Sequence, residues 1–445
     1  METDRSQLIR RMTLEEEDDV VGERYDANLK KFLGLDKPFR VQENQVGSLL
    51  GEEEIEAVAR CLRSGAGLSW SGENLWQFEQ EFARYCGVKH AVAVTSCTAA
   101  LRIATQILRL REGDEIIATP QTFHPTILAA AERGVTVRFA DTLPLTMNID
   151  PGTIEDKITS KTRAVFVCHM NGNPVDMDPV MEIAKRHGLF VVDDAAHAPG
   201  AEYKGRKIGS IGDITCFSFH SLKNMTTGEG GMLTTNNDKF AEEARKLRAM
   251  GVLGPRRQKQ QRAIGRYQEP ADDLSDHSDG AWNSEFIAIE EWGGHARMSD
   301  VQAAIGLVQL RKLDRMNAVR IATAEQYNQA FRGLPGIRLL EVSPKDKCVY
   351  HLYPFFLDRK VLDVSPYVFG QHLENKKGIH IIRRFFPLNL IPYMQFRGHQ
   401  PGECPVTEKV FFEELIDLPI WTGMPEEKLR IVIDAVKETI SELSR

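Results

Sequence analysis

A lysine in a polar loop and an aspartate at the end of an apolar run are the first residues here that could do chemistry. Lys223 lies in "CFSFHSLKNMTTGEGGM", where Cys216–Phe219 is typical of a short strand and a glycine-bearing loop follows. Asp194 is the second acid of "VVDDAAH", directly after another apolar run. Small hydroxyl residues in "TSCTAAL", including Thr98, stand where a helix should begin, and Thr95 or Ser96 could cap that helix.

This combination suits pyridoxal phosphate. The cofactor needs a lysine amine to form an imine, and a carboxylate that keeps its pyridine nitrogen protonated so that the ring can accept electrons. Its phosphate binds well to N–H groups and hydroxyls at the start of a helix, and its ring gains from a stacked aromatic side chain. Motifs of other chemistries are absent: the chain has no H-E-x-x-H zinc motif, no Walker loop, no G-x-G-x-x-G after a strand and no G-x-S-x-G.

The elements that must position these residues alternate between strand and helix from about residue 46. The strands are expected at "HAVAV", "DEIIATP", "VTVRFAD", "RAVFVCHM", "LFVVDD", "GDITCFSF" and "GGMLTTN". Several are continuously apolar, which indicates an α/β fold with a mostly parallel central sheet flanked by helices on both faces. Ligands of such sheets bind beyond the carboxyl ends of the strands, where "TSCT", "PQTFH", "HMNGN", "DDAAH" and "SFHSLK" all fall.

We predict three regions along the chain. Residues 1–45 form a polar N-terminal arm, residues 46–316 the large cofactor-binding domain, and residues 317–445 a smaller C-terminal α/β domain. Residues 252–292 are expected to form a long loop, basic in its first half and acidic in its second. The basic half could contact anionic substrate groups, although a solvated loop is the commoner outcome.

Composition narrows the function classes. The 445 residues carry a formal net charge of −7, which argues against nucleic-acid binding. No apolar run is long enough to span a bilayer, and the charged N-terminus lacks the apolar core of a signal peptide. The seven cysteines are scattered without C-x-x-C spacing, which favours a reducing, cytoplasmic location and argues against disulfides and a zinc site, so we expect no metal.

From about residue 60 to the C-terminus the chain resembles the DegT/DnrJ/EryC1/StrS family of pyridoxal-phosphate-dependent sugar aminotransferases. That family has the aspartate aminotransferase fold, fold type I. The resemblance rests on "AVTSCTAAL", "TPQTFHPT", "VCHMNGNPVDMD", "VVDDAAHAPGAEYKGRKIGSIGD", "CFSFHSLKNMTTGEGGMLTTN", "ARMSDVQAAIGLVQLRKLD", "YHLYPF" and "LPIWTGM". Each motif is weak alone, and their order is specific.

The resemblance implies roles for the residues at matching positions. Lys223 would be the Schiff-base lysine and Asp194 the partner of the pyridine nitrogen; their alternatives are a solvated charge and a helix N-cap. His197 would lie near the phenolic oxygen, unless it is a packed structural histidine. Ser218 and Thr98 would bind the phosphate, unless they only cap.

Phe123 matches the ring-stacking aromatic, and a core phenylalanine is its alternative. The chain also departs from the family pattern. Cys97 stands where the family usually has glycine, so it would keep the backbone N–H that binds the phosphate but would crowd the phosphate. His295 replaces an asparagine that reaches the phosphate of the neighbouring subunit and could serve that role, and Asn171 replaces a tyrosine or similar residue on the substrate side.

The resemblance implies an aminotransferase that moves an amino group from glutamate or glutamine to a keto sugar, often nucleotide-linked, or to a keto-cyclitol. Such products commonly feed antibiotic, lipopolysaccharide or other secondary-metabolite sugars. The fold implies a homodimer with shared active sites. Two alternatives stay open: a sugar dehydratase or deoxygenase of the same fold, whose members typically lack the lysine, and a non-enzymatic regulatory relative. The presence of Lys223 disfavours the first, and the presence of both Lys223 and Asp194 disfavours the second.

Overall fold

The computed structural model describes residues 47–65, 68–69, 72–251 and 291–444. The predicted arm over residues 1–45 and all but the last two residues of the predicted 252–292 loop lie outside these ranges.

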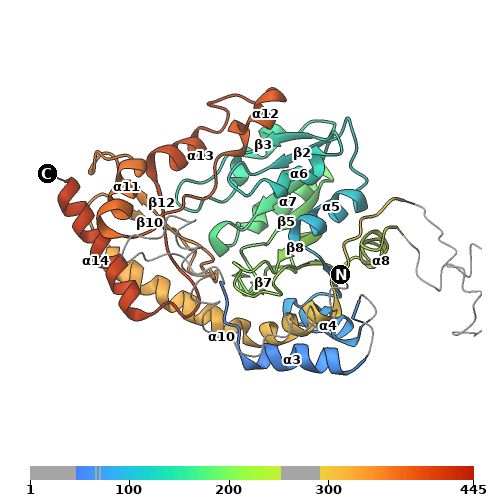
Figure 1. Ribbon diagram of the computed structural model, residues 1–445. Helices are drawn as coiled ribbons and strands as arrows, with labels where there is room; N and C mark the ends of the chain where they lie inside the picture. Colours follow the sequence, from blue (N-terminus) through green and yellow to red (C-terminus); the bar gives the residue numbers. More distant parts are fainter. Residues whose placement is uncertain (1–46, 66–67, 70–71, 252–290, 445) are drawn as a thin grey trace, which may run out of the picture. The chain divides into compact units, whose positions relative to one another are not determined.

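A seven-stranded sheet forms the centre of the large part of the fold (Figure 1). Its order is β1-β9-β8-β5-β4-β2-β3, with β1 (His90–Val94), β2 (Glu115–Ala118), β3 (Thr136–Phe139), β4 (Thr162–Cys168), β5 (Phe190–Asp194), β8 (Ile214–Ser218) and β9 (Gly231–Thr235). Five neighbouring strands pair in parallel, in the order β3, β2, β4, β5 and β8. β9 is antiparallel to both of its neighbours, β8 and β1. The prediction of a mostly parallel sheet is confirmed.

Helices cover both faces of this sheet. One apolar cluster joins the sheet to α4 (Glu73–Cys86), α7 (Met177–His187) and α10 (Asp300–Phe331). A second joins the other face to α5 (Cys97–Ile107), α6 (Pro125–Ala131) and α8 (Asp238–Leu247). Because side chains alternate along a strand, β4 contributes Val165 and Val167 to the first cluster and Phe166 to the second. α3 (Glu52–Arg63) packs on α10.

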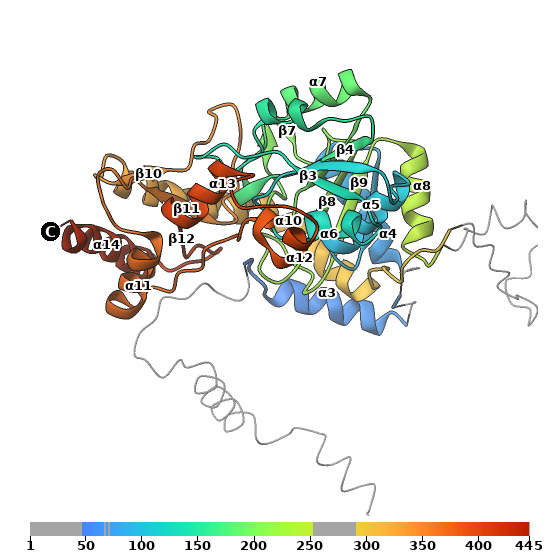
Figure 2. The ribbon, with the colours of Figure 1, turned by 90° about the horizontal axis from the view of Figure 1, so that it is seen from above.

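The C-terminal part contains a second, three-stranded antiparallel sheet with the order β10 (Ile337–Leu339), β11 (Tyr353–Leu357) and β12 (Leu415–Leu418) (Figure 2). α11 (Pro366–Lys377) packs on α14 (Glu426–Leu443), and the short helices α12 (Pro392–Phe396) and α13 (Pro405–Lys409) lie between β11 and β12 in the sequence. α10 is one continuous helix across residue 316, so the domain boundary placed there stays a prediction.

Local sequence signals explain how the key helix begins. The Ser96 hydroxyl accepts a hydrogen bond from the N–H of Ala99 at 3.1 Å, so Ser96, not Thr95, caps α5.

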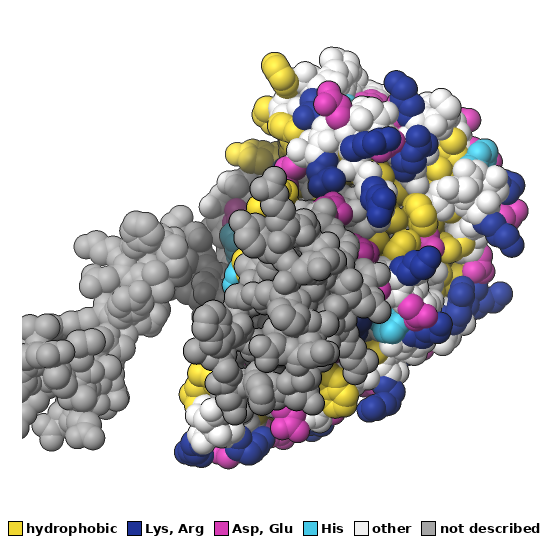
Figure 3. All heavy atoms as spheres, turned by 90° about the vertical axis from the view of Figure 1, so that its right-hand side faces the viewer, with side chains coloured by type: hydrophobic (Ala, Val, Ile, Leu, Met, Phe, Trp, Pro, Cys, Tyr) yellow, Lys and Arg dark blue, Asp and Glu magenta, His cyan; other side chains and the backbone are white. Residues whose placement is uncertain are grey.

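No helix within the described ranges is both long and apolar enough to cross a membrane. On the face shown in Figure 3, Lys and Arg side chains are interspersed with Asp and Glu, so its charge is mixed.

Candidate active site at the carboxyl edge of the large sheet

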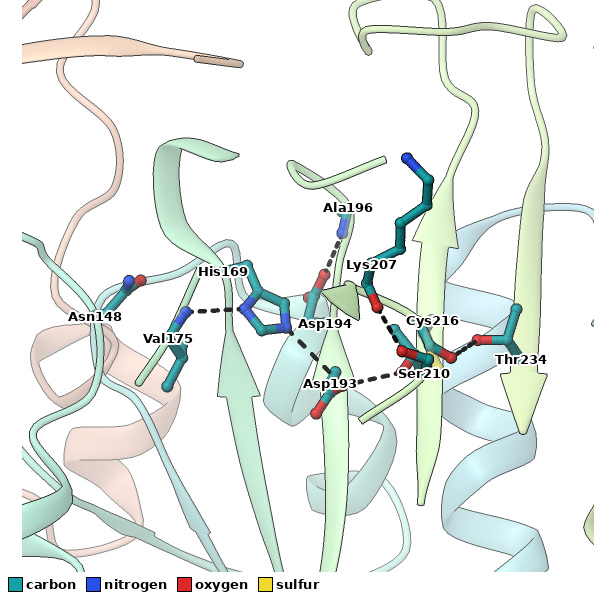
Figure 4. A network of polar contacts seen from close by, with 12 residues as sticks. Asn148, His169, Val175, Asp193, Asp194, Ala196, Lys207, Ser210, Cys216 and Thr234 are labelled. Atoms are coloured by element: carbon teal, nitrogen blue, oxygen red, sulfur yellow. Dashed lines mark hydrogen bonds and ion pairs between the residues drawn. The ribbon is translucent and has the colours of Figure 1, made fainter. Parts of the chain in front are cut away.

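Asp194, the last residue of β5, is contacted by polar groups from three segments. Its Oδ2 accepts a hydrogen bond from the Thr126 hydroxyl of α6 at 2.6 Å, and its Oδ1 accepts one from the N–H of Ala196 at 3.0 Å (Figure 4). The Cys97 thiol at the start of α5 lies 3.7 Å from Oδ1. The carboxylate is thus buried, but both of its oxygens have partners that fix its direction.

Asp193 points to the opposite face of the same strand, as alternation requires. Its Oδ2 accepts a hydrogen bond from Thr215 Oγ1 at 2.9 Å and lies 3.9 Å from His169 Nε2. His169 Nδ1 in turn accepts a hydrogen bond from the N–H of Val175 at 3.1 Å (Figure 4). Both Asp193 and His169 are fully buried.

Lys223 lies in the loop between β8 and β9, and its side chain is half-buried. Burial lowers the pKa of its amine to about 8, even though the nearby Asp194 carboxylate raises it. Lys223 Nζ lies 3.4 Å from Nε2 of His351, which precedes β11. An amine with this pKa is neutral in about a tenth of the molecules at pH 7, far more than an ordinary lysine, so it can act as a nucleophile or base.

His197 follows β5 and is buried between two other rings. Its ring centroid lies 4.3 Å from that of His351 and 5.8 Å, in stacked geometry, from that of Phe385. Burial lowers the pKa of His197 well below its usual range, and the Lys223 charge lowers it further. Among the described residues, Nδ1 of His197 has no hydrogen-bond partner. A buried ring nitrogen without a partner is costly, so this atom is suited to a polar group of a bound molecule.

The predicted phosphate-binding residues lie at the start of α5 and the end of β8. Ser218 is buried and its hydroxyl lies 3.4 Å from the N–H of His220 as an acceptor. Thr98 is half-buried in the first turn of α5. Cys97 Sγ donates to the carbonyl oxygen of Cys216 at 3.4 Å, which ties the helix start to β8. Burial raises the pKa of Cys97 well above its usual range, so it is a neutral thiol here.

Phe123 and His295 have exposed side chains. Phe123 is 51% exposed, which rules out a core phenylalanine, and its ring lies 5.5 Å from that of Phe385. His295 Nε2 lies 3.1 Å from a guanidinium nitrogen of Arg297. Within the described ranges, no hydrogen bond or ion pair links His295 to another predicted site residue; its backbone forms a bridge with Ala249.

The chain matches the DegT/DnrJ/EryC1/StrS aminotransferase family over residues 48–437. It belongs to this family. The spore coat polysaccharide biosynthesis protein SpsC of Bacillus subtilis is 38% identical over 395 residues, which cover 88% of this chain and 95% of SpsC. The dTDP-3-amino-3,4,6-trideoxy-alpha-D-glucose transaminase of Streptomyces venezuelae is 34% identical over 391 residues, which cover 87% of this chain and 92% of that enzyme.

Solved structures agree with the family assignment. The S. venezuelae DesV structure in complex with a ketimine intermediate superposes with a TM-score of 0.74 at 33% identity, covering 87% of this chain and 94% of DesV. An aminotransferase from Psychrobacter cryohalolentis gives a TM-score of 0.79 at 28% identity, covering 92% and 100%. The chain is therefore a pyridoxal-phosphate-dependent aminotransferase of fold type I.

The residues of this aminotransferase fit its cofactor. The carboxyl ends of β8 and β5 supply an amine with a lowered pKa, a fixed carboxylate and an unpartnered ring nitrogen on His197, and the Lys223 charge acts on His197. The capped start of α5 adds N–H groups for a phosphate. Gly231 has room for no larger residue, because a Cβ there would lie 2.5 Å from the carbonyl carbon of Ser96.

Sequence reasoning missed His351, Thr126 and Arg384. His351 lies in "YHLYPF", a motif that carries the family resemblance, but the resemblance assigned it no role; in the structure it precedes β11. Thr126 lies in the motif "TPQTFHPT" and could have been chosen as a hydroxyl near Asp194. Nothing in the sequence placed Arg384 here, yet its charge lowers the pKa of Lys223, His197 and His351.

Proposed function

We propose that this aminotransferase transfers an amino group from L-glutamate or L-glutamine to a keto sugar, often nucleotide-linked, or to a keto-cyclitol. The observation that carries the proposal is the Lys223 amine, whose pKa burial lowers to about 8 near the Asp194 carboxylate. The sugar acceptor is supported by the Streptomyces venezuelae relative, whose name specifies a deoxyamino sugar transaminase. A place in antibiotic or other secondary-metabolite sugar biosynthesis is part of the same proposal.

Each site residue is given one role. Lys223 would hold pyridoxal phosphate covalently through Nζ, and Asp194 would hold its pyridine nitrogen. When bound, the cofactor supplies the electron sink for the charge that forms at the donor's α-carbon. Ser218, Thr98 and the N–H groups at the start of α5, including that of Cys97, would bind the phosphate.

The remaining roles concern the ring and the substrates. Phe123 would stack on the cofactor ring and His197 would hydrogen-bond its phenolic oxygen. Lys223, once released by the donor, would take the proton from the donor's α-carbon and pass it to the cofactor; in the second half-reaction it would move a proton from the cofactor to the acceptor carbon. Arg384 would bind a carboxylate of the amino donor, because its cation already acts on Lys223 and His197.

We also propose a cytoplasmic homodimer with shared active sites. The exposed His295 would reach the phosphate in the partner's site, which would make a monomer inactive. All seven cysteines are free thiols and buried, which supports a reducing compartment. Mixing inactive Lys223→Ala and His295→Ala chains tests the sharing: re-association should restore about a quarter of the sites, because each heterodimer has one intact pair. No recovery would reject a shared site.

Spectroscopy of the holoenzyme tests the amino-transfer reaction. The absorbance of the bound cofactor should shift to that of pyridoxamine phosphate on addition of L-glutamate or L-glutamine, and Lys223→Ala should abolish the shift. The pyridoxamine form should then be discharged by a nucleotide-linked keto sugar or a keto-cyclitol. Release of a dehydrated sugar without amine transfer would instead support the dehydratase, and a protein that binds no cofactor would support a regulatory role.

A further inference from the structure

A chain of polar contacts runs from the interior of the fold to the catalytic lysine. Lys223 Nζ lies 3.4 Å from His351 Nε2, and His351 Nδ1 lies 3.2 Å from Asn224 Oδ1. Asn224 Nδ2 donates to Asn317 Oδ1 of α10 at 2.9 Å. His351, Asn224 and Asn317 are all buried, so water does not compete for these contacts.

Backbone carbonyls determine how both amides are turned. Asn224 Nδ2 also donates to the carbonyl oxygen of Val349 at 3.0 Å, and Asn317 Nδ2 donates to that of Pro199 at 2.9 Å. A carbonyl can only accept, so each NH₂ group must face its carbonyl and each amide oxygen must face the other way. The Asn224 oxygen is therefore directed at His351.

The Asn224 oxygen in turn decides which nitrogen of His351 carries the proton. Burial lowers the pKa of His351 well below its usual range, and the Lys223 charge adds to this, so the imidazole is neutral. A neutral imidazole has one donor nitrogen and one acceptor nitrogen. Because Asn224 Oδ1 only accepts, Nδ1 is the donor, and the lone pair of Nε2 faces the lysine amine.

The backbone around His351 holds the ring in place. The N–H of His351 donates to the carbonyl oxygen of Asn171 at 2.8 Å, and the preceding Tyr350 takes the left-handed φ of 43°. Gly172, with φ +83°, permits this approach, because a Cβ there would lie 3.1 Å from His351 N. The ring of His197 packs against the imidazole at 4.3 Å.

We propose that His351 is a positioning residue that accepts a hydrogen bond from the Lys223 amine at Nε2, and that Asn224 and Asn317 lock its tautomer. The bond directs the free amine toward the donor's α-carbon and stabilises the ammonium group formed when Lys223 takes up that proton. Lys223 passes this proton on to the cofactor and not to His351, so His351 remains neutral throughout. This proposal rests on the role given to Lys223 under the proposed function.

The tautomer can be measured without turnover. Protein labelled with ¹⁵N-histidine is loaded with pyridoxamine phosphate, which leaves Lys223 free, and His351→Gln assigns the resonance. We expect the Nδ1 shift of a protonated nitrogen and the Nε2 shift of an unprotonated one, and Asn224→Leu should lose that preference. A proton on Nε2 in the wild type would overturn the proposal.

Kinetics separate positioning from packing. His351→Leu should slow the donor half-reaction about 10²-fold and raise the isotope effect of a donor deuterated at the α-carbon, because proton transfer becomes more rate-limiting. His351→Gln, whose amide oxygen can still accept, should recover part of the rate. The matched control is His372→Gln, a buried histidine of α11 paired with Glu442 at 2.7 Å, and it should react like the wild type.

The outcomes also separate this proposal from the proposed function. If Lys223→Ala abolishes the half-reaction while His351→Leu leaves rate and isotope effect unchanged, the positioning role is wrong and the lysine assignment stands. If Lys223→Ala reacts normally, the lysine assignment itself is wrong. Should His351→Leu not fold, Asn224→Leu replaces it, with a smaller loss of rate of about tenfold expected and an unchanged rate overturning the proposal.

Discussion

Asp193 and Asp194 are neighbours in β5 and both are buried, at 0% and 5% exposure, yet their surroundings differ. Asp193 contacts Thr215 and His169 inside the covered face of the sheet. Asp194 is held by Thr126 and Ala196 at the sheet edge, where it acts on the pKa of Lys223. The two carboxylates therefore share burial and residue type, and what distinguishes Asp194 is its position near a titratable amine.

The largest expected effect comes from changing the two acids in parallel. Asp194→Asn should lower the amino-transfer rate by about 10²–10³-fold, because the group that stabilises charge on the cofactor is lost. Asp193→Asn should leave the rate within about twofold and reduce the free energy of unfolding by about 1 kcal/mol. Single-turnover kinetics measure the amino-transfer rates, and urea unfolding measures the free energies of unfolding. Equal loss of rate in both variants would show that the two faces are not functionally distinct.

Lys223 offers the next largest effect, on stability. Its pKa falls from 10.5 to about 8 on folding, so between these values the unfolded state binds more protons and stability rises with pH. The charged amine thus costs the cofactor-free protein about 3 kcal/mol below pH 8. Lys223→Met should be more stable than the wild type at pH 7, with the gap closing as pH approaches 10.5. Urea unfolding of both apoproteins between pH 7 and 10.5 measures the difference in their free energies of unfolding. A difference that does not change with pH would contradict the prediction.

Arg384 contributes a positive charge that acts on Lys223, His197 and His351. Arg384→Leu should raise the KM for L-glutamate about 10- to 100-fold by removing the proposed carboxylate contact, and Arg384→Lys should raise it less. Because Arg384 lowers the pKa of Lys223, its loss should also move the acidic limb of the rate profile to higher pH. If the KM were unchanged but the pH–rate profile shifted, Arg384 would act only through its charge and the carboxylate contact would be rejected.

The smallest effects should come from the two threonines that donate to the two acids. Thr126→Val removes the hydroxyl on Asp194 and should lower the amino-transfer rate and cofactor affinity about tenfold or less. Thr215→Val removes the hydroxyl on Asp193 and should cost about 1 kcal/mol of stability with the rate unchanged. Both threonines are fully buried and the replacements have the same shape, so each controls for the other. If Thr215→Val lowered the rate and Thr126→Val did not, the functional role would belong to Asp193 and not to Asp194.

The sequence was sufficient for the order of elements and for the residues that follow the strands. Apolar runs and alternating helical segments predicted a mostly parallel sheet, because burial on both faces requires such runs. Asp194 ends β5, and His197 and Lys223 follow β5 and β8, so their convergence on one edge could be predicted from topology alone. The roles of these residues and the domain boundary at residue 316 stay predictions.

Only the tertiary structure decided which distant residues complete the site. His351 and Asn317 lie far from Lys223 along the chain, and no local pattern encodes which way the amides of Asn224 and Asn317 turn. The antiparallel direction of β9 depends on pairing between strands, not on its own apolar residues. The exposure of Phe123 also depends on the tertiary structure, because its ring neighbour Phe385 comes from another part of the fold. Sequence periodicity specifies which face of an element is buried, whereas the partner across that face is chosen by packing.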